Sequence, residues 1–258
     1  MLLHSFHFVT SSPWPLIISL ALFNTTASAV CYMHSVGGSD LSLLLSLLLT
    51  VFTMALWFRD VLTEGTYLGD HTLDVQAGLG LGMLLFLVTE LLIFFSIFWA
   101  YFHSALAPVV ELAASWPPVG IAPIDPYSLP LLNTVLLLSS GAAITYGHHA
   151  LVGGSRDGVL YGVVVTVLLA LVFTACQGLE YVDAGFTMAD GVFGSSFYLA
   201  TGTHGFHVIV GTIFIAIGLW RAYRYHLTEA HHKGFESAIL YWHMVDVVWL
   251  FLFAALYW

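Results

Sequence analysis

The sequence predicts an all-α membrane protein with seven transmembrane helices. Hydrophobic residues make up 59% of the 258 residues and charged residues only 8%, whereas an ordinary soluble domain has about 25% charged residues. The mean hydropathy is +0.92, and long apolar stretches recur along the whole chain. The net charge of −10 leaves no basic patch for a phosphate backbone. These values exclude a soluble domain, a disordered chain and a nucleic-acid binder, and they predict a single polytopic domain over residues 1–258.

Seven apolar segments reach the length of about 20 residues that a membrane-spanning helix needs. The segments between them contain the Gly, Pro, Ser and Asp residues that are typical of turns. The third and sixth helices are longer than a hydrocarbon core of about 30 Å requires, so we expect them to tilt or to project from the membrane. The expected helices are 13–34, 41–58, 74–106, 129–150, 157–181, 191–224 and 233–257.

The placement of the basic residues supports seven spans. With an odd number of spans, the N-terminus shares a side of the membrane with the second, fourth and sixth loops. All five basic residues lie at those loops, namely Arg59, Arg156, Arg221, Arg224 and Lys233. The positive-inside rule therefore predicts an N-terminus on the inner side, in the cytoplasm or mitochondrial matrix, and a C-terminus outside. Six or eight spans would place these basic residues on both sides of the membrane.

Glu90 is the sharpest candidate for a functional group inside the membrane. It lies in an apolar run near the middle of the third predicted helix, where an ionised carboxylate is costly, so we expect the neutral form. One interpretation is a proton relay or a hydrogen bond between subunits. The other is a structural carboxyl that a neighbouring helix satisfies, and the sequence favours this second interpretation because many perturbed groups are structural.

Asp246 is a second intramembrane carboxylate. His243 precedes it by three residues, which places both side chains on one face of a helix. We expect the two side chains to pair, because pairing lowers the free-energy cost of placing each polar group inside the membrane. We predict no catalytic residue in the chain. Glu180 lies near the end of the fifth predicted helix, where we expect water to reach it.

Thirteen histidines are many for so apolar a chain and raise the question of a metal or haem site. His204 and His207 are three residues apart in the sixth predicted helix, and most of the others fall at predicted helix ends, where an amphipathic ring can anchor at the interface. The chain has neither a HisGluXxxXxxHis motif nor a Cys/His cluster. We therefore predict no metal ligand and no haem ligand in this chain.

Small and aromatic residues indicate how the helices pack. Gly78 with Gly82 and Gly158 with Gly162 form GxxxG pairs, which let helix backbones approach closely in lipid. Several tryptophans, Trp249 among them, fall near segment ends and suggest an aromatic belt. Four basic residues at one interface could hold lipid phosphates or serve only to set topology, and both interpretations stay open for Arg59, Arg221, Arg224 and Lys233.

Eight stretches in the same order resemble subunit III of cytochrome c oxidase. The resemblance runs from about residue 4 to the C-terminus. The stretches are SPWP at 12–15, FRDVLTEGT at 58–66, TE at 89–90 with FFSIFWAYFHSALAP at 94–108, LPLLNT at 129–134, YGHHA at 146–150, QGLEY at 177–181, DGVFGSSFYLATGTHGFHVIVG at 190–211 and YWHMVDVVWLFL at 241–252.

The resemblance implies a seven-helix fold in which a lipid-filled cleft separates the first two helices from a five-helix bundle. It also implies a non-catalytic core subunit of respiratory complex IV that binds no cofactor of its own apart from structural phospholipids. Haem and copper would belong to partner subunits, above all the catalytic subunit I, which reduces dioxygen to water and pumps protons. The subunit would stabilise subunit I and support proton uptake, and it would contact other oxidase subunits and membrane phospholipids.

The same resemblance suggests particular residues. Glu90 matches the intramembrane glutamate of the family. Six further residues fall near family lipid contacts, namely Arg59, Glu64, His71, Arg221, His226 and Lys233. Thr10 stands where the family often has Asp, and Ala77 and Leu79 replace basic residues, which puts one lipid-phosphate contact in doubt.

The implied location is the mitochondrial inner membrane, with the N-terminus in the matrix and the C-terminus in the intermembrane space. A bacterial member would lie in the plasma membrane. Two other classes compete with this interpretation. A stand-alone transporter with Glu90 as its coupling group would usually show internal repeats and broken helices, which the sequence lacks. A haem-bearing redox protein would need facing histidines at matched depth.

Overall fold

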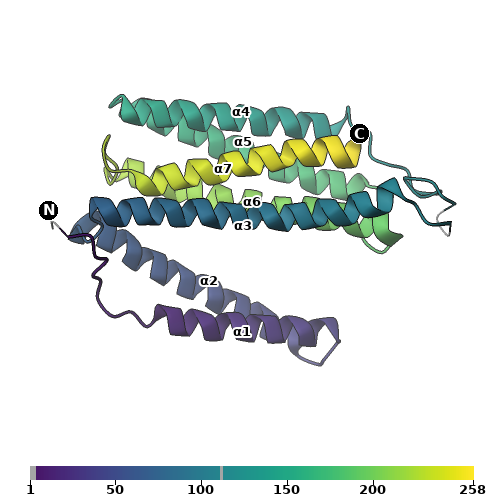
Figure 1. The fold of residues 1–258 in the computed structure, drawn as a ribbon, viewed down its shortest axis with the longest axis horizontal. Coiled ribbons are helices and arrows are strands. Elements are labelled where there is room, and N and C mark those ends of the chain that lie inside the picture. Colours follow the sequence, from purple (N-terminus) through teal and green to yellow (C-terminus); the bar gives the residue numbers. More distant parts are fainter. Residues whose placement is uncertain (1–3, 111–112) are drawn as a thin grey trace. The chain divides into compact units, whose positions relative to one another are not determined.

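The computed structural model describes residues 4–110 and 113–258, and these residues contain seven long helices and no strand (Figure 1). All seven are long and apolar enough to cross a membrane, which confirms the predicted fold class. The helices are α1 (Trp14–Met33), α2 (Ser39–Thr63), α3 (Leu73–Leu106), α4 (Leu129–Val152), α5 (Arg156–Asp183), α6 (Gly191–Tyr223) and α7 (Lys233–Leu252).

The largest difference from the predicted bounds is at the end of α2. The sequence predicted an end at residue 58, but α2 continues to Thr63 and then through a π-helical turn at Glu64–Leu68. Arg59 and Asp60 pair with each other through a 2.7 Å contact, so the helix tolerates both charges at its end. The helical path stops at Gly69, whose φ of +74° favours glycine.

By contacts among its own residues the chain divides into two compact units, residues 1–79 and 80–258. In the first unit, α1 and α2 form a helical hairpin whose turn ends at Gly38, with a φ of +78°. Small hydroxyl side chains meet between the two helices: Thr25 Oγ1 lies 3.0 Å from Thr50 Oγ1, and Ser28 Oγ lies 2.8 Å from Ser42 Oγ. Such residues let helices approach closely in lipid.

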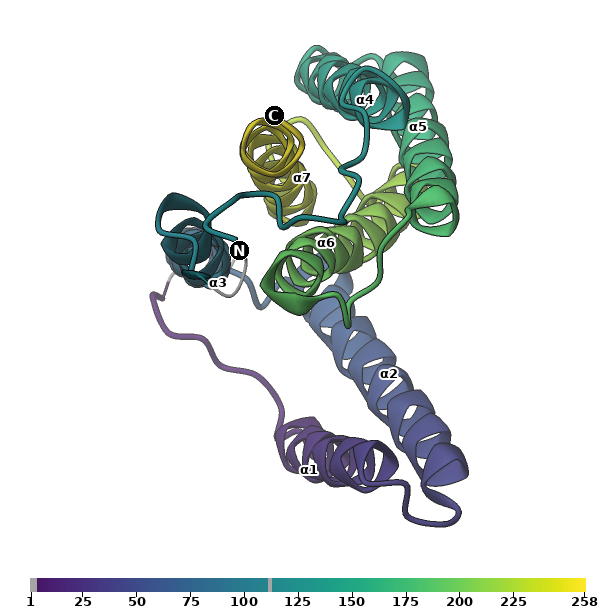
Figure 2. The same ribbon diagram turned by 90° about the vertical axis from the view of Figure 1, so that its right-hand side faces the viewer.

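In the second unit, α4, α5, α6 and α7 form a ring in which each helix contacts the next (Figure 2). Gly162 of α5 packs on Gly147 of α4, and a Cβ on Gly162 would meet the α4 backbone at 2.7–2.8 Å. The predicted role of the Gly158–Gly162 pair in helix packing is therefore confirmed for this interface.

Helix α7 supplies two of the largest buried side chains of the core, Trp242 and Trp249, which are 0% and 1% exposed. Their indole N–H groups donate to Ser140 and Thr134 of α4, both at 2.9 Å, as a buried tryptophan requires. The placement of Trp249 in an aromatic belt was wrong, because its N–H finds a partner inside the bundle. The single polytopic domain and the lipid-filled cleft stay predictions.

Candidate functional site

The intramembrane Glu90 of α3 pairs with His207 of α6. Glu90 Oε2 lies 2.8 Å from His207 Nε2, and the two side chains are 17% and 7% exposed. Phe94, one turn after Glu90 and 2% exposed, packs its ring 5.2 Å from the His207 ring. The Tyr241 ring of α7 stacks on the same imidazole, with the ring centres 6.2 Å apart.

The second nitrogen of His207 limits where the proton can be. His207 Nδ1 lies 2.7 Å from the backbone carbonyl oxygen of Thr203. Because a carbonyl oxygen only accepts, Nδ1 must carry a hydrogen. The contact with Glu90 therefore contains one further proton, held either by the carboxyl of a neutral pair or by the imidazole of an ion pair. The carboxyl is satisfied by a neighbouring helix, as the structural interpretation requires.

Asp246 of α7 is buried against α4. His243 Nδ1 is 3.5 Å from Asp246 Oδ2, which confirms the expected local pair, and His243 Nε2 is 3.2 Å from Thr145 Oγ1. Gly141 of α4 makes room for the carboxyl, since a Cβ there would lie 2.5 Å from Oδ2. Within the described residues, buried Asp246 Oδ1 has no hydrogen-bond partner.

The burial of Glu180 contradicts the prediction that water reaches this side chain. It is 2% exposed rather than within reach of water. The Tyr257 hydroxyl donates to its Oε1 at 2.5 Å, and the Gln177 amide donates to the same oxygen at 3.1 Å. The spacing of Gln177 and Glu180 by three residues is visible in the sequence, but Tyr257 is 77 residues away. The buried network could not be predicted without the packing of the last helix.

Three of the six expected lipid-contact residues lie in residues 1–79. Arg59 pairs with Asp60, and its side chain is 64% exposed. Glu64 Oε2 is 3.8 Å from His71 Nε2, and the His71 ring meets the His7 ring edge-on at 5.4 Å. Burial and, next, the charge of His7 lower the pKa of His71, although Glu64 opposes this shift.

The other three lie in residues 80–258, where α6 ends and α7 begins. Arg221 is in the last turn of α6, and its Nη1 would lie 2.8 Å from a Cβ on Gly234. The His226 ring packs on Trp220 at 5.3 Å, and partial burial together with the nearby arginines lowers the pKa of His226. Lys233 Nζ donates to Glu236 Oε2 at 2.8 Å.

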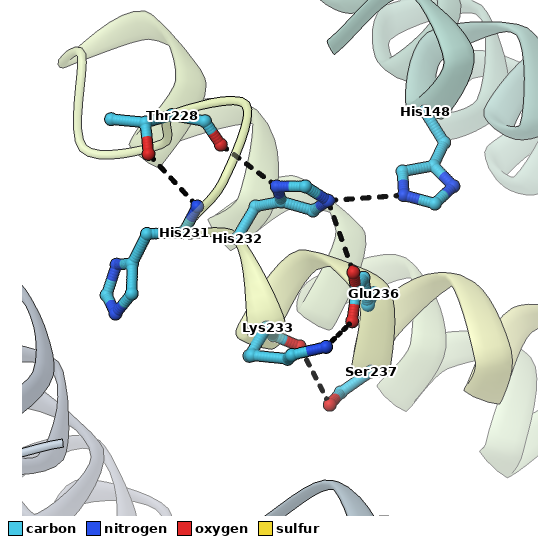
Figure 3. A network of polar contacts seen from close by, with 7 residues as sticks. All are labelled: His148, Thr228, His231, His232, Lys233, Glu236 and Ser237. Carbon is cyan, nitrogen blue, oxygen red and sulfur yellow. Dashed lines mark hydrogen bonds and ion pairs between the residues drawn. The ribbon is translucent and has the colours of Figure 1, made fainter. Parts of the chain in front are cut away.

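The histidines of the bundle occupy separate environments. His204 is 1% exposed, and its Nε2 lies 3.2 Å from the Val245 carbonyl oxygen, away from the Glu90 contact of His207. A cluster that the sequence did not predict brings together His148, His232 and Glu236 (Figure 3). The residues at 148 and 232 are 84 positions apart, so no local spacing could have indicated the cluster.

The comparisons with known proteins agree with one another. The family model described as cytochrome c oxidase subunit III matches residues 4–258. A Podospora anserina protein named cytochrome c oxidase subunit 3 is 58% identical over 254 residues, which cover 98% of this chain and 94% of that protein. Proteins of the same name from Neurospora crassa and Prototheca wickerhamii are 58% and 54% identical, over 98% of this chain and 94% and 97% of their own lengths.

Proposed function

The chain belongs to the cytochrome c oxidase subunit III family, and on that premise we propose that it is a membrane scaffold for the catalytic subunit and its phospholipids. As a non-catalytic subunit of complex IV, it is an enzyme only as part of that complex and lacks redox centres. It is a multi-pass protein of the mitochondrial inner membrane. The match over residues 4–258 carries this conclusion. The comparisons give no support to a stand-alone transporter.

We propose that the face formed by α4 and α7 contacts the catalytic subunit. His243 lies near the middle of the span Lys233–Tyr257, yet its side chain is 42% exposed. An imidazole exposed at this depth is costly even though its two nitrogens contact Asp246 and Thr145 within the chain. A neighbouring helix with polar side chains would lower that cost. Haem and copper would lie in that neighbour.

A photo-crosslinking residue at position 243 tests this contact in the intact membrane. The proposal expects a covalent adduct between this chain and the catalytic subunit. The same probe at Leu171, an exposed residue of α5, serves as the control for the opposite helix. Adducts only with lipid at position 243, or equal adducts with the catalytic subunit at both positions, would exclude the α4–α7 face as the specific contact.

We propose that phospholipid headgroups bind at the basic helix ends. Arg59, Glu64 and His71 would form one group, and Arg221, His226 and Lys233 another. In the first group the Arg59 guanidinium is largely exposed, and in the second the Lys233 side chain is 51% exposed. Cationic groups at a helix end attract anionic headgroups, and the Glu64 carboxylate would accept from an amine-bearing headgroup.

We propose that the N-terminus lies in the matrix and the C-terminus in the intermembrane space. In residues 80–258 the basic side chains gather at one end of the bundle: the Arg156 guanidinium at the start of α5 lies 4.0 Å from the Tyr225 ring beyond α6. The positive-inside rule assigns that end to the matrix. Protease treatment of mitoplasts should remove a C-terminal tag and leave an N-terminal tag intact. The reverse pattern would invert the topology.

We propose that Glu90 supports proton uptake only indirectly, by fixing α3 to α6. The single-proton contact between Glu90 and His207 joins two long helices near their middles. Substitution of Glu90 by Gln separates this structural role from proton transfer.

A further inference from the structure

Three metal-ligating side chains converge where α4 ends and α7 begins, outside the carboxylate and lipid positions discussed above. His148 comes from α4, His232 immediately precedes α7, and Glu236 lies in the first turn of α7 (Figure 3). His148 Nε2 is 3.4 Å from His232 Nε2, and His232 Nε2 is 3.2 Å from Glu236 Oε1. The three ligand atoms all lie within 4.8 Å of one another.

The backbone fixes the tautomer of the central histidine. His232 Nδ1 lies 2.9 Å from the carbonyl oxygen of Thr228, so Nδ1 must be the hydrogen-bearing nitrogen. Neutral His232 then presents the lone pair of Nε2 toward the other two groups. This arrangement, with one ring nitrogen held by a carbonyl, is typical of histidines that bind metal.

The facing atoms require a cation between them. The Nε2 lone pair of neutral His232 meets the carboxylate oxygen of Glu236 at 3.2 Å, and two acceptors at that distance repel each other. Either a proton on His232 or a metal ion removes the repulsion. His232 is 7% exposed, whereas the Glu236 side chain is 37% exposed, so a hydrated ion can reach the cluster from one side.

The spacing fits a small tetrahedral ion. Zinc binds imidazole nitrogen and carboxylate oxygen at about 2.0–2.2 Å, which places neighbouring ligand atoms of a tetrahedron about 3.4 Å apart. His232 Nε2 lies 3.4 Å from His148 Nε2 and 3.2 Å from Glu236 Oε1, and all three ligand atoms lie within 4.8 Å of one another. Lys233 Nζ donates to Glu236 Oε2 at 2.8 Å, which orients the carboxylate with Oε1 toward His232 and leaves that oxygen for the ion.

We propose that His148, His232 and Glu236 bind one Zn²⁺ ion, with water as the fourth ligand. Two imidazoles and one carboxylate are an established donor set for zinc with an open position. The ion would tie the end of α4 to the start of α7 at the basic end of the bundle. This proposal departs from the absence of metal ligands that the sequence predicted, and it does not depend on which subunit contacts the chain.

Anomalous diffraction at the zinc edge tests the proposal on the purified oxidase complex equilibrated with ZnCl₂. We expect an anomalous peak within about 2.0–2.2 Å of His148 Nε2, His232 Nε2 and one oxygen of Glu236. Absence of a peak there at saturating zinc would overturn the proposal and leave a proton between the groups. Because this measurement uses the wild-type chain, it does not depend on the folding of any variant.

The number of zinc ions per purified complex, compared between variants, is the second measurement. Glu236→Gln and His148→Gln should each lower the zinc content of the washed complex by one ion per copy relative to the wild type. His231→Gln is the matched control, since its ring points away from the cluster (Figure 3). Equal zinc contents in the wild type, both cluster variants and the control would also overturn the proposal.

Discussion

Glu90 Oε2 and His207 Nε2 lie 2.8 Å apart and join α3 to α6 near the middle of both helices. The hydrogen on His207 Nδ1 is committed to the Thr203 carbonyl oxygen, so the contact holds one proton and has no spare donor. A carboxyl that would be costly alone in the membrane is thereby satisfied within the chain. We propose that its role is to cross-link the two helices.

Glu90→Gln should leave complex assembly and oxygen reduction nearly unchanged. The Gln amide can donate to His207 Nε2 or accept from it, so the helix contact persists while the titratable proton is lost. Proton-pumping stoichiometry in reconstituted vesicles is the deciding measurement. Normal assembly with a large loss of pumping would instead establish Glu90 as a relay.

Glu90→Leu is the comparison for Glu90→Gln, and it should destabilise the folded complex. It leaves His207 Nε2 without a partner in a buried position, at a cost of about 1–3 kcal/mol. The thermal midpoint of the detergent-solubilised complex should fall for Glu90→Leu and stay near the wild-type value for Glu90→Gln. Equal midpoints for the two variants would argue against a structural bond.

Gly162→Ala should destabilise the α4–α5 contact by about 1–3 kcal/mol, or more if the helices cannot separate. The new methyl group would lie 2.7 Å from the Ala143 carbonyl oxygen and 2.8 Å from Gly147 Cα. Because these are backbone atoms, the clash can be relieved only by moving the helices apart. Gly178→Ala, on the same helix with no atom of the described residues within 4 Å, should be neutral or slightly stabilising. Thermal denaturation of the purified complex compares the two variants.

Acid should weaken the contacts of His71. Burial and the charge of His7 lower the pKa of His71 below its usual value of about 6.5, so the folded state binds fewer protons than the unfolded state. The stability contribution is therefore complete above about pH 6.5 and is lost as the pH falls below that value. Between pH 7.5 and pH 5.5, the midpoint of the wild type should fall further than that of His71→Gln. Equal decreases in the midpoints of the wild type and His71→Gln would show that His71 does not contribute to the pH dependence of stability.

Arg221→Ala should reduce the number of phospholipids that remain bound through purification. Arg156→Ala is the control, because Arg156 lies at the same end of the bundle and is not one of the predicted lipid contacts. Its guanidinium lies on the Tyr225 ring and donates to the Tyr223 carbonyl oxygen at 3.0 Å. Lipid mass spectrometry of the purified complex gives the counts. Unchanged counts in Arg221→Ala would remove Arg221 from the set of lipid contacts.

Local patterns in the sequence predicted those features that depend on neighbouring residues. Apolar length located all seven helices, and the spacing of three residues predicted the pair of His243 with Asp246. The end of α2 was misplaced because the charged residues there pair with each other and do not stop the helix.

Long-range contacts were beyond a single sequence. Glu90 was identified as a buried carboxyl, but its partner His207 is 117 positions away. Glu180 was assigned to water because position along a helix does not reveal that Tyr257 covers it. Trp249 was assigned to the interface for the same reason: its partner, Thr134, lies in another helix. Each error concerns a side chain whose surroundings are set by packing between distant segments.

The visible spectrum of the complex before and after removal of this chain tests the central claim most directly. Detergent that releases the chain should leave the haem absorption and the initial rate of oxygen reduction with the remaining subunits, and the released chain should show no Soret band. A Soret band that stays with the released chain would contradict a scaffold that leaves electron transfer to its neighbours.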